Sequence, residues 1–480
     1  MKVVLNDVVN HAKIKNKIAL VDKDESLTYK EFLDKLVSFG VFLSENNVQK
    51  NDTVVVQCKH NIPYLVSMLG CHLYGAVFVP TEKDIKKDAI NELSKNVNAK
   101  LVISDLFEDK YILQNIYNNL KIVEQQVIVP KEDDISDYLF TTGTTGTPVG
   151  IIHTFKSHYA TAENLIHTVN MPKDNVTAIT APLNHAFAIR RLYSNLINGS
   201  KIVLIDGVFP PMNFFNMIKD NGVKSLVMVP SSMMLILKLT KDELSKYKEQ
   251  LIYIEFATAP LTVEQVKHIN SLLPNTDIFN VYGSTESGCV LSFNYTKEIK
   301  RKACIGVPTI NAEILILDEK GNIITGNGKE NAGFLASKGS MNMKGYYNNE
   351  EKTASVMKDG MIVTKDIIYR DDEGFHYFIG RDGDVINIGG LKVAPTEIEA
   401  IMMDYDGILD GACTSEANEL SGSVPVALIV KKDDFDEKKY FEYMASKLEA
   451  FKIPRRTVYV TEIPRTYNGK ILRRKLKELI

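Results

Sequence analysis

The sequence predicts an α/β protein with a large N-terminal body of parallel and mixed sheets with helices, a small β-barrel or hairpin layer, and a small mobile C-terminal α+β domain. Three observations support this prediction. The chain has 480 residues, more than one hydrophobic core usually organises, so two or more domains are expected. Short apolar strands alternate with helices up to about residue 300, which is typical of parallel sheets with crossover helices. From residue 305 the pattern changes to short strands with frequent glycines, and a second α/β pattern follows.

In the N-terminal body, runs rich in valine and isoleucine alternate with segments whose apolar residues are spaced three and four apart. The first strands are expected at residues 53–56, 76–79 and 101–103, with helices at residues 62–73 and 85–96. The same alternation predicts later strands at residues 201–205, 225–229, 252–257 and 276–281, and a helix at residues 263–273. We place the body at residues 1–380 and a C-terminal lid domain at residues 381–480, with a hinge near Gly383.

Composition restricts the classes of function. Hydrophobic residues make up 45% and charged residues 24% of the chain, which is typical of a globular protein and argues against a disordered or collagen-like chain. The 57 basic and 60 acidic side chains give a net charge of -3, so no overall charge favours nucleic acid or a membrane surface. The apolar residues 226–239 are interrupted by Pro230, Ser231 and Ser232, so no membrane span is expected.

The N-terminus and the cysteines predict the cellular compartment. No long apolar run follows a basic segment at the N-terminus, so no secretory signal is expected. The five cysteines stand far apart without a Cys-x-x-Cys pair, which argues against a disulfide framework or a zinc knuckle and favours a reducing cytoplasm. They are Cys58, Cys71, Cys289, Cys304 and Cys413. A cytoplasmic enzyme is therefore expected.

A segment rich in threonine and glycine, between two strand-like runs, is the most informative motif. It reads Thr141-Thr142-Gly143-Thr144-Thr145-Gly146-Thr147-Pro148-Val149-Gly150. Glycines allow backbone amides to approach a ligand closely, and threonine hydroxyls add hydrogen-bond donors, so the segment is suited to phosphate oxygens. It is not a Walker loop, because no Gly-Lys-Ser/Thr opens a helix there. A flexible surface hairpin is the alternative interpretation.

A second motif follows a predicted parallel strand and reads Asn280-Val281-Tyr282-Gly283-Ser284-Thr285-Glu286-Ser287-Gly288. Ligands of open α/β sheets bind at the carboxyl ends of strands. At such a position Tyr282 can stack on a base and Asn280 can bond an adenine edge. Thr285 can donate to a phosphate, and Glu286 offers a hard oxygen ligand for Mg2+. The alternative is a solvated loop with an ordinary turn glycine.

Two further motifs lie toward the C-terminus. Asp366 precedes the first, in which Gly380-Arg381-Asp382-Gly383-Asp384 leads to Gly389-Gly390, and an acidic residue is the usual partner of ribose hydroxyls. The second ends in Asn468-Gly469-Lys470, within residues 452–480, which contain nine Lys or Arg and two Asp or Glu. A lysine on a glycine turn can be delivered to a polyanionic ligand. A basic, solvated terminal helix is the alternative interpretation.

These four motifs, in this order, resemble those of the adenylate-forming (ANL) superfamily, which contains acyl-CoA synthetases (the AMP-dependent synthetase and ligase family), luciferases and peptide-synthetase adenylation domains. The resemblance extends over nearly the whole chain and includes Gly333-Phe334-Leu335, Lys344-Gly345-Tyr346-Tyr347-Asn348 and Lys452-Ile453-Pro454. It implies an AMP-forming acid–thiol ligase. Such an enzyme activates a small carboxylic acid with ATP and Mg2+ as an acyl-adenylate, then passes the acyl group to a thiol, here expected to be that of coenzyme A.

The resemblance also implies roles for the residues of the first two motifs. Thr285 would hold the α-phosphate, and Glu286 would hold Mg2+. Adenine would be contacted by Asn280 and Tyr282, and Gly283 would belong to the same nucleotide site. The β- and γ-phosphates would be held by Thr141, Thr142, Gly143, Thr144, Thr145 and Gly146.

The C-terminal motifs would serve both half-reactions. Asp366 and Arg381 would contact the ribose hydroxyls. Lys470 would bridge the substrate carboxylate and the α-phosphate during adenylate formation. Rotation of the lid domain would then withdraw Lys470 and bring Gly389 and Gly390 to the thiol channel.

Three departures from the family pattern stand out. The family's phosphate loop commonly ends in Pro-Lys-Gly, whereas this chain has Pro148-Val149-Gly150. Loss of that cation is expected to weaken pyrophosphate binding unless nearby Lys156 compensates. Gly383 stands at a hinge position that is often Asp or Lys, and glycine keeps rotation permissive, although Asp382 or Asp384 can equally be aligned there. Thr364-Lys365-Asp366 replaces the usual Thr-Gly-Asp.

The segments that line the acyl pocket in the family match residues 184–187, 228–230 and 256–259. Amino-acid-activating domains usually have an aspartate in the first segment to hold the amine. Asn184-His185 stands there instead, which favours a carboxylic acid without an α-amino group. His185 is also compatible with a structural histidine near the sheet edge. The residues expected beside the acid are His185, Val229, Ala257, Thr258 and Ala259.

Two alternatives remain open. One is an adenylation enzyme that loads an acyl or amino acid onto the phosphopantetheine of an acyl carrier protein, an acidic partner suited to the basic C-terminal segment. The other is a catalytically silent nucleotide-binding homologue, suggested by Val149. Retention of Glu286, Asp366, Arg381 and Lys470 argues against silence. A dehydrogenase or a serine hydrolase is disfavoured, because the chain has neither a Gly-x-Gly-x-x-Gly after its first strand nor a Gly-x-Ser-x-Gly.

Overall fold

The computed structural model describes residues 2–108, 111–123, 127–142, 148–257, 259–301, 303–388, 391–418, 421–465 and 471–480. The contacts between residues divide the chain into two compact units. Unit 1 comprises residues 1–314 and 337–363, and unit 2 comprises residues 315–336 and 364–480. Unit 2 therefore takes in part of the glycine-rich β segment as well as the C-terminal residues. The predicted domain boundary at residue 380 and the hinge near Gly383 stay predictions.

One sheet of unit 1 has the strand order β17-β7-β6-β4-β3-β5. Its strands are β3 (Thr53–Gln57), β4 (Val77–Thr81), β5 (Ala99–Ile103), β6 (Ile135–Thr142), β7 (Pro148–Thr154) and β17 (Gly345–Tyr346). The first three pair in parallel, with α3 (Ile62–Tyr74) and α4 (Lys87–Asn96) as crossover helices, and β6 and β7 form an antiparallel hairpin. Every residue of β3 is buried, as its valine run leads one to expect for a covered parallel strand. The elements predicted between residues 53 and 103 are confirmed to within two residues.

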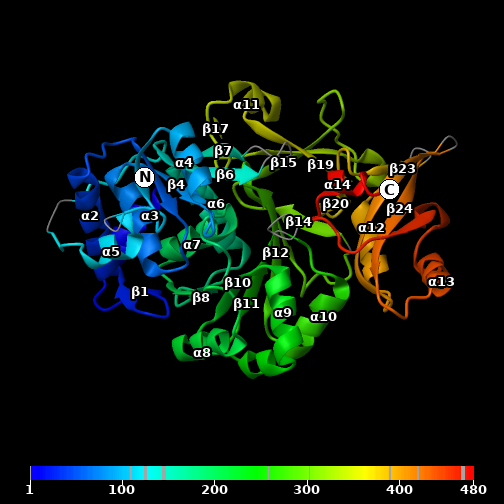
Figure 1. Cartoon of the computed structure of the whole chain (residues 1–480), viewed down its shortest axis with the longest axis horizontal. Coiled ribbons are helices and arrows are strands. Elements are labelled where there is room, and N and C mark those ends of the chain that lie inside the picture. Colours follow the sequence, from blue (N-terminus) through cyan, green and yellow to red (C-terminus); the bar gives the residue numbers. More distant parts are fainter. Residues whose placement is uncertain are drawn as a thin grey trace. The chain divides into compact units, whose positions relative to one another are not determined.

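The second sheet of unit 1 follows the order β14-β13-β12-β11-β10-β8-β9-β1-β2. Its strands are β1 (Ile18–Val21), β2 (Ser26–Thr28), β8 (Val176–Ile179), β9 (Lys201–Leu204), β10 (Ser225–Met228), β11 (Tyr253–Phe256), β12 (Asp277–Ser284), β13 (Gly288–Asn294) and β14 (Cys304–Pro308). The neighbours from β9 to β12 pair in parallel, and β13 returns antiparallel to β12. Figure 1 shows β10, β11 and β12 side by side near α9 (Pro230–Thr240) and α10 (Val263–Leu272). The strands predicted between residues 201 and 281 are confirmed to within three residues.

The main core of unit 1 joins α2 (Tyr29–Glu45), α3 and α7 (Ala186–Asn198). Phe39 of α2, Leu69 of α3 and Leu192 of α7 lie in this core, and each is at most 1% exposed. Gly70 allows the close packing of α2 on α3, because a Cβ at this position would lie 2.8 Å from Phe39. α6 (Phe155–Thr168) packs against α7 and against β13. Both helices therefore connect the sheets to the segment that contains the second motif.

Unit 2 contains antiparallel hairpins and a small α+β layer. Most of β19 (Met361–Arg370) pairs antiparallel with β20 (His376–Arg381), in the strand order β15-β16-β19-β20 that includes β15 (Glu313–Leu317) and β16 (Gly333–Lys338). Among the described residues these four strands are neighbours in one sheet. The C-terminal sheet has the order β22-β21-β24-β23, with β25 on β24. Its elements are β21 (Ile386–Ile388), β22 (Leu391–Val393), β23 (Ile408–Asn418), β24 (Gly422–Lys431) and β25 (Arg456–Tyr459), with helices α12 (Pro395–Met403), α13 (Glu437–Lys447) and α14 (Arg473–Leu476).

The structure bears on two expectations drawn from composition. In the described part of the chain, no helix has the length and apolar composition that crossing a membrane requires. All five cysteines are buried and unpaired with one another. Burial raises the pKa of the Cys58 thiol to about 12, so this thiol stays protonated near neutral pH.

Ionisation of Asp7 lowers the free energy of unfolding, so its effect on stability depends on pH. It lies in α1 (Val4–His11), where burial raises the pKa of its carboxyl group from 3.8 to about 6. The folded protein therefore binds this proton more tightly than the unfolded chain, and the charged carboxylate destabilises the fold above pH 6. The cost disappears as pH falls toward 4. Asp7→Asn is expected to raise the free energy of unfolding by about 1 kcal/mol at pH 7.5, reduced by partial solvent screening, and to leave it unchanged at pH 4.

Thermal denaturation at the two pH values measures this difference. The exposed Asp24→Asn is the control and is expected to have no effect at either pH. An equal gain from Asp7→Asn at both pH values would show that removal of the charge is not the cause.

Candidate functional site

The candidate residues of unit 1 gather at one edge of the second sheet. The strands β8, β10, β11 and β12 are adjacent in this sheet, and their carboxyl ends meet at the same edge because they run parallel. His185 lies in the segment after β8 as the N-cap of α7, Val229 follows β10, and Ala257 follows β11. This edge is where open α/β sheets bind ligands. The structure therefore brings together the predicted acyl-pocket residues that it describes, whereas Thr258 lies outside the described residues.

Asn280 and Tyr282 lie on one face of β12. Phe279 and Val281 join the apolar clusters around α6, together with Val169 and Leu165. Because side chains alternate along a strand, Asn280 and Tyr282 are directed to the opposite face. Asn280 is 6% exposed and Tyr282 is half-buried.

Gly283 has a structural reason to be glycine. A Cβ at this position would lie 1.9 Å from the carbonyl oxygen of Gly288 across the β12–β13 turn. The close approach of the two strands requires the absence of a side chain. Contact with adenine is therefore not needed to explain this glycine.

Arg190 of α7 forms hydrogen bonds to the turn after β12. Its Nη1 donates to the carbonyl oxygen of Ser284 at 2.8 Å, and its Nη2 donates to that of Thr285 at 2.7 Å. Within the turn, the N–H of Ser287 donates to the hydroxyl of Ser284 at 3.1 Å, and the N–H of Ser284 donates to that of Ser287 at 3.2 Å. Thr285 and Glu286 occupy the tip of this turn and are half-buried.

Glu286 is clamped by the segment that leads to β17. The hydroxyl of Tyr346 donates to Glu286 Oε1 at 2.9 Å, and the N–H of Met343 donates to the Glu286 carbonyl oxygen at 2.7 Å. Burial and the nearby Glu286 carboxylate raise the pKa of Tyr346 well above its usual range, so the phenol keeps its proton as a donor. Tyr346 pairs with Ile151 of β7. The clamp therefore joins the Glu286 turn to the strand that leaves the threonine/glycine loop.

The β6–β7 hairpin brings Thr141 opposite Val149 at the mouth of this loop. Gly143, Thr144, Thr145 and Gly146 lie outside the described residues, as does the side chain of Thr142. Gly150 lies under the ring of Phe140, where a Cβ would be 2.8 Å from the ring. Val149 packs against the apolar cluster that includes Ile151 and Tyr346.

Lys156 does not lie near the loop. It is in the first turn of α6, beyond the far end of β7, and its Nζ is 3.7 Å from Asp133 Oδ1. The seven residues of β7 separate it from Pro148 by about 20 Å. The expectation that Lys156 compensates for Val149 is therefore wrong, because the strand carries its charge away from the loop.

A buried carboxylate with two histidines around it anchors the base of the hairpin. Asp137 of β6 accepts a hydrogen bond from His158 Nε2 of α6 at 2.8 Å, and His72 Nε2 of α3 lies 3.9 Å from the same carboxylate. Burial alone raises the pKa of Asp137, but the surrounding histidines more than offset it and hold the pKa below its usual range. Burial lowers the pKa of His72 to about 4. This cluster fixes β6 against α3 and α6.

The predicted ribose contacts are neighbours in unit 2. Asp366 of β19 pairs across the hairpin with Arg381 of β20, and Arg381 Nε lies 3.2 Å from Asp366 Oδ1. Gly383 follows in a turn with φ of +84°, a conformation that favours glycine. Gly389, Gly390 and Lys470 lie outside the described residues.

Four of the nine basic side chains of residues 452–480 are paired with carboxylates of unit 2. Arg473 forms a bidentate pair with Glu399 at 2.8 and 2.9 Å, and Lys452 Nζ lies 2.6 Å from Glu397. Arg456 pairs with Glu416 and Arg465 with Asp410, each at 2.7 Å. The charge run of residues 452–480 therefore presents a less basic surface than its sequence indicates.

The sequence motifs did not include Arg190, Arg191 or Tyr346 as site residues. Arg191 forms a buried ion pair with Glu255 at 2.5 Å, in which the two side chains are 2% and 3% exposed. Two successive arginines inside an otherwise apolar helical stretch were the available signal, because buried charges need partners. Tyr346 belongs to a quoted motif, but its contact with Glu286 spans 60 residues and leaves no local pattern.

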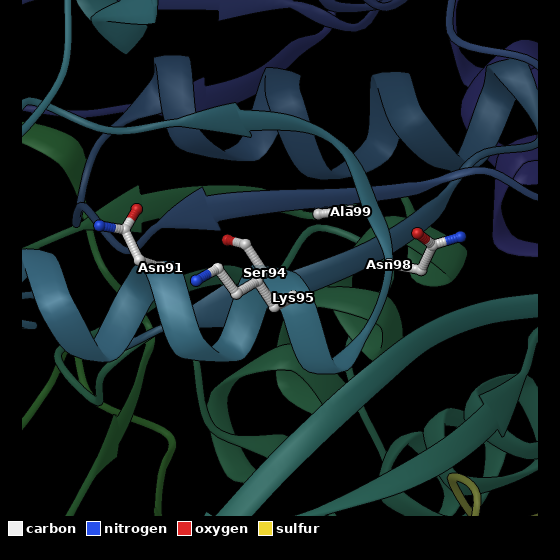
Figure 2. Close-up of a pocket in the computed structure, with 5 residues that line it drawn as sticks. All are labelled: Asn91, Ser94, Lys95, Asn98 and Ala99. Carbon is white, nitrogen blue, oxygen red and sulfur yellow. The ribbon is translucent and has the colours of Figure 1, made fainter.

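Two surface pockets differ in their relation to this site: the first lies away from it, and the second is lined in part by Met343, whose N–H donates to the Glu286 carbonyl oxygen. One of about 410 Å³ is lined by Asn91, Ser94, Lys95, Asn98 and Ala99. Figure 2 shows the first three on α4 and the last two beyond its C-terminal end. None of them belongs to a motif. Another of about 310 Å³ includes Thr154, Lys156 and Lys344 among its lining residues. The strand-end geometry, rather than these pockets, marks the candidate site.

Two family models match the chain. The model described as AMP-binding enzyme matches residues 9–347, well over half of the sequence. The chain belongs to the AMP-binding enzyme family. The model described as AMP-binding enzyme C-terminal domain matches residues 397–470. The resemblance of the motifs to adenylate-forming enzymes is thereby confirmed.

Relatives and solved structures of this AMP-binding enzyme agree with the assignment. The 2-succinylbenzoate–CoA ligase of Bacillus cytotoxicus is 24% identical over 476 residues, which cover 97% of this chain and 96% of the relative. The 4-coumarate–CoA ligase-like protein 6 of Arabidopsis thaliana is 27% identical over 73% of this chain and 63% of its own length. ATP-bound MatB of Rhodopseudomonas palustris has a TM-score of 0.88 at 20% identity, covering 99% of this chain and 98% of MatB. The o-succinylbenzoate CoA synthetase of Bacillus subtilis with its acyl-adenylate has a TM-score of 0.87 at 22% identity, covering 98% of each chain. These structures confirm the α/β fold with its small C-terminal domain.

Proposed function

We propose that this AMP-binding enzyme is an AMP-forming acid–thiol ligase. It converts a carboxylic acid and ATP to an acyl-adenylate and pyrophosphate, then transfers the acyl group to the thiol of coenzyme A with release of AMP. The observation that carries the proposal is the family match over residues 9–347 and 397–470. The CoA ligases among the relatives support the thiol acceptor.

The first half-reaction sets the demands on the site. A carboxylate oxygen attacks the α-phosphorus, and the bond from that phosphorus to the departing pyrophosphate oxygen breaks. Both reactants are anions, so the protein must position them and stabilise charge on the transferring phosphorus. In the proposal, residues 141–146 hold the β- and γ-phosphates, Thr285 holds the α-phosphate, and Lys470 bridges the α-phosphate and the carboxylate.

Adenine, ribose and thiol contacts complete the assignment. Asn280 and Tyr282, on one face of β12, are proposed to contact adenine, supported by their shared direction away from α6. Asp366 and Arg381 are proposed to contact the ribose hydroxyls, supported by their pairing across one hairpin. Gly389 and Gly390 are proposed to line the thiol channel in the second half-reaction.

Glu286 fits a magnesium ion bound together with nucleotide. No group of three or more His, Cys, Asp or Glu suited to a metal is found among the described residues. Mg2+ at nucleotide sites commonly takes one or two carboxylates and completes its octahedron with phosphate oxygens and water. A single carboxylate oriented by the Tyr346 hydroxyl meets this need. When bound there, Mg2+ would neutralise charge on the phosphate oxygens.

The acid is proposed to lack an α-amino group. Residues 184–187 contain no aspartate that could hold an amine. The carboxylate beside this segment, Glu82, accepts a hydrogen bond from Asn184 Nδ2 at 3.0 Å. His185, Val229, Ala257, Thr258 and Ala259 are proposed to line the acid site. Because 2-succinylbenzoate–CoA ligases are among the relatives, aryl and dicarboxylic acids are the first to test.

Pyrophosphate–ATP exchange with separate pools of aliphatic, aryl, dicarboxylic and amino acids tests the proposal. Exchange with one non-amino pool, followed by consumption of coenzyme A thiol, is the expected result. Exchange with amino acids, or transfer only to a carrier-protein pantetheine, would favour the carrier-loading alternative. ATP binding without exchange in any pool would favour the silent homologue.

The acceptor of the acyl group and the cellular location complete the proposal. Arg456, Arg465 and Arg473 are each paired with a carboxylate of unit 2, which leaves less of the basic charge of residues 452–480 available to an acidic carrier protein. A cytoplasmic location is supported by the five buried, unpaired cysteines.

Tyr346→Phe is expected to weaken metal binding selectively. It deletes the hydroxyl that donates to Glu286 Oε1 and keeps the ring. Loss of a partner that orients a metal ligand typically costs tenfold or more in metal affinity. We expect the Mg2+ concentration for half-maximal exchange to rise about 10-fold. The measurement is Mn2+ binding in the presence of ATP, followed by electron paramagnetic resonance.

Tyr347→Phe is the matched control. The Tyr347 ring lies against Tyr138, with 4.6 Å between ring centroids, and no contact between Tyr347 and Glu286 is found. Its Mn2+ affinity is expected to match that of the unaltered protein. Equal losses in the two variants would contradict a specific role for the Tyr346 hydroxyl.

A further inference from the structure

Arg190 is a buried arginine that forms no ion pair with a described carboxylate. It is 4% exposed, and its Nε is buried without a hydrogen-bond partner among the described residues. The next residue, Arg191, has the opposite environment, because Glu255 neutralises it at 2.5 Å. The carboxylates of Glu286 and Asp137 attract its charge without forming an ion pair with it. Its direct partners are therefore the two carbonyl oxygens of the Ser284–Glu286 turn.

The two hydrogen bonds of Arg190 determine the orientation of two peptide planes. Arg190 contacts the carbonyl oxygens of Ser284 and Thr285 at 2.8 and 2.7 Å. In a trans peptide the carbonyl and the following N–H point in opposite directions. The N–H groups of Thr285 and Glu286 are therefore directed away from Arg190. They lie on the side of the turn that faces away from α7.

These two N–H groups have no other use in the described structure. The amides of Ser284 and Ser287 are satisfied by each other's hydroxyl groups. Those of Thr285 and Glu286 donate to no described residue. Successive main-chain N–H groups that point to one side form a concave site for an anionic oxygen. A guanidinium on the carbonyl side polarises both peptides and makes their N–H groups stronger donors.

We propose that Arg190 is a positioning residue that orients the Thr285 and Glu286 amides as a binding site for a phosphate oxygen of the nucleotide, the α-phosphate. The inference rests on the proposed function and adds a residue to it. Charge builds on the α-phosphate oxygens as the carboxylate attacks, so oriented amides stabilise the adenylation transition state. Arg190 acts through the turn and does not itself contact the nucleotide.

Equilibrium binding of AMP and of adenosine to the full-length protein separates this role from a structural one. The two probes differ only in the phosphate. Arg190→Gln is expected to weaken AMP binding about 10- to 100-fold, the effect of losing charge-assisted hydrogen bonds, while adenosine affinity changes less than about twofold. Arg190→Lys keeps the charge but cannot donate to both carbonyl oxygens in the same geometry, so we expect an intermediate loss of AMP affinity. Ser194→Ala is the control on α7, since its hydroxyl bonds only the Arg191 carbonyl oxygen, and should leave both affinities unchanged.

Equal weakening of AMP and adenosine by Arg190→Gln would overturn the proposal, as would an unchanged affinity for AMP. Hydrogen exchange of residues 283–288 in the unaltered protein gives a second test that needs no variant. AMP is expected to slow exchange there more than adenosine does, and identical protection would overturn the proposal. If the unaltered protein shows no preference for AMP and no pyrophosphate–ATP exchange, the proposed function itself fails. If the unaltered protein prefers AMP over adenosine and Arg190→Gln keeps the same preference, only the role of Arg190 is overturned.

Discussion

Lys470→Ala is expected to slow adenylate formation by about 100- to 1000-fold, the usual effect of removing one group that stabilises developing charge. Lys470 is proposed to bridge two anions, the substrate carboxylate and the α-phosphate, at the moment their charges converge. Transfer from a supplied acyl-adenylate to coenzyme A should stay largely unchanged, because that step joins a thiol to an activated acyl group. Pyrophosphate–ATP exchange measures the first step, and thioester formation from synthetic acyl-adenylate measures the second.

Lys475→Ala is the matched control for this prediction. Lys475 is an exposed lysine of the same basic segment, in α14, and it lies outside the motif. Its removal should leave both half-reactions unchanged. Equal loss of both half-reactions in Lys470→Ala would contradict the rotation of a lid domain that serves two steps.

Arg191→Met is expected to cost about 3–5 kcal/mol in the free energy of unfolding. Both partners of the Arg191–Glu255 pair are buried, and each lies on an element that builds the site, α7 and β11. Burial lowers the pKa of Arg191, but Glu255 more than offsets it and raises it, so the Arg191 guanidinium is charged in the fold. Removing only the arginine leaves a carboxylate in the interior without a counter-charge. Chemical denaturation measures the loss.

The double variant Arg191→Met, Glu255→Met is expected to recover most of this stability, because a well-packed apolar pair often replaces a buried ion pair at little cost. Lys246→Met is the surface control. Lys246 lies 2.7 Å from Glu243 but is 67% exposed, and its loss should have little effect on stability. Similar effects of Lys246→Met and Arg191→Met would contradict the role of burial.

Most of the fold could be predicted because it depends on local patterns. The valine run of β3 and the helical spacing of α3 follow periods of two and 3.6 residues, so their positions agree with the sequence to within one residue. The glycine-rich segment after residue 305 was predicted as short strands, but the pattern left a barrel and hairpins equally open. Strand pairing there depends on contacts between residues far apart in sequence, and the described structure shows β15, β16, β19 and β20 as neighbours in one sheet.

The motif residues could be predicted because each combines a chemically suitable side chain with a turn or a strand end. Asn280, Tyr282 and Glu286 stand in a single short segment, and its place after a parallel strand is visible in the sequence. Lys156 shows the opposite case. It is near the loop in sequence, but an extended strand of seven residues carries it about 20 Å from the loop.

The amino-acid order alone therefore establishes the family, the α/β class and the motif segments, because these depend on periodicity and on residues close together in the chain. The folded arrangement adds the contacts that bring distant segments together. Arg190 reaches the Thr285 carbonyl across 95 residues, and Tyr346 reaches Glu286 across 60. No local pattern encodes such pairs, since they arise only when α7, the β12–β13 turn and β17 pack around one site.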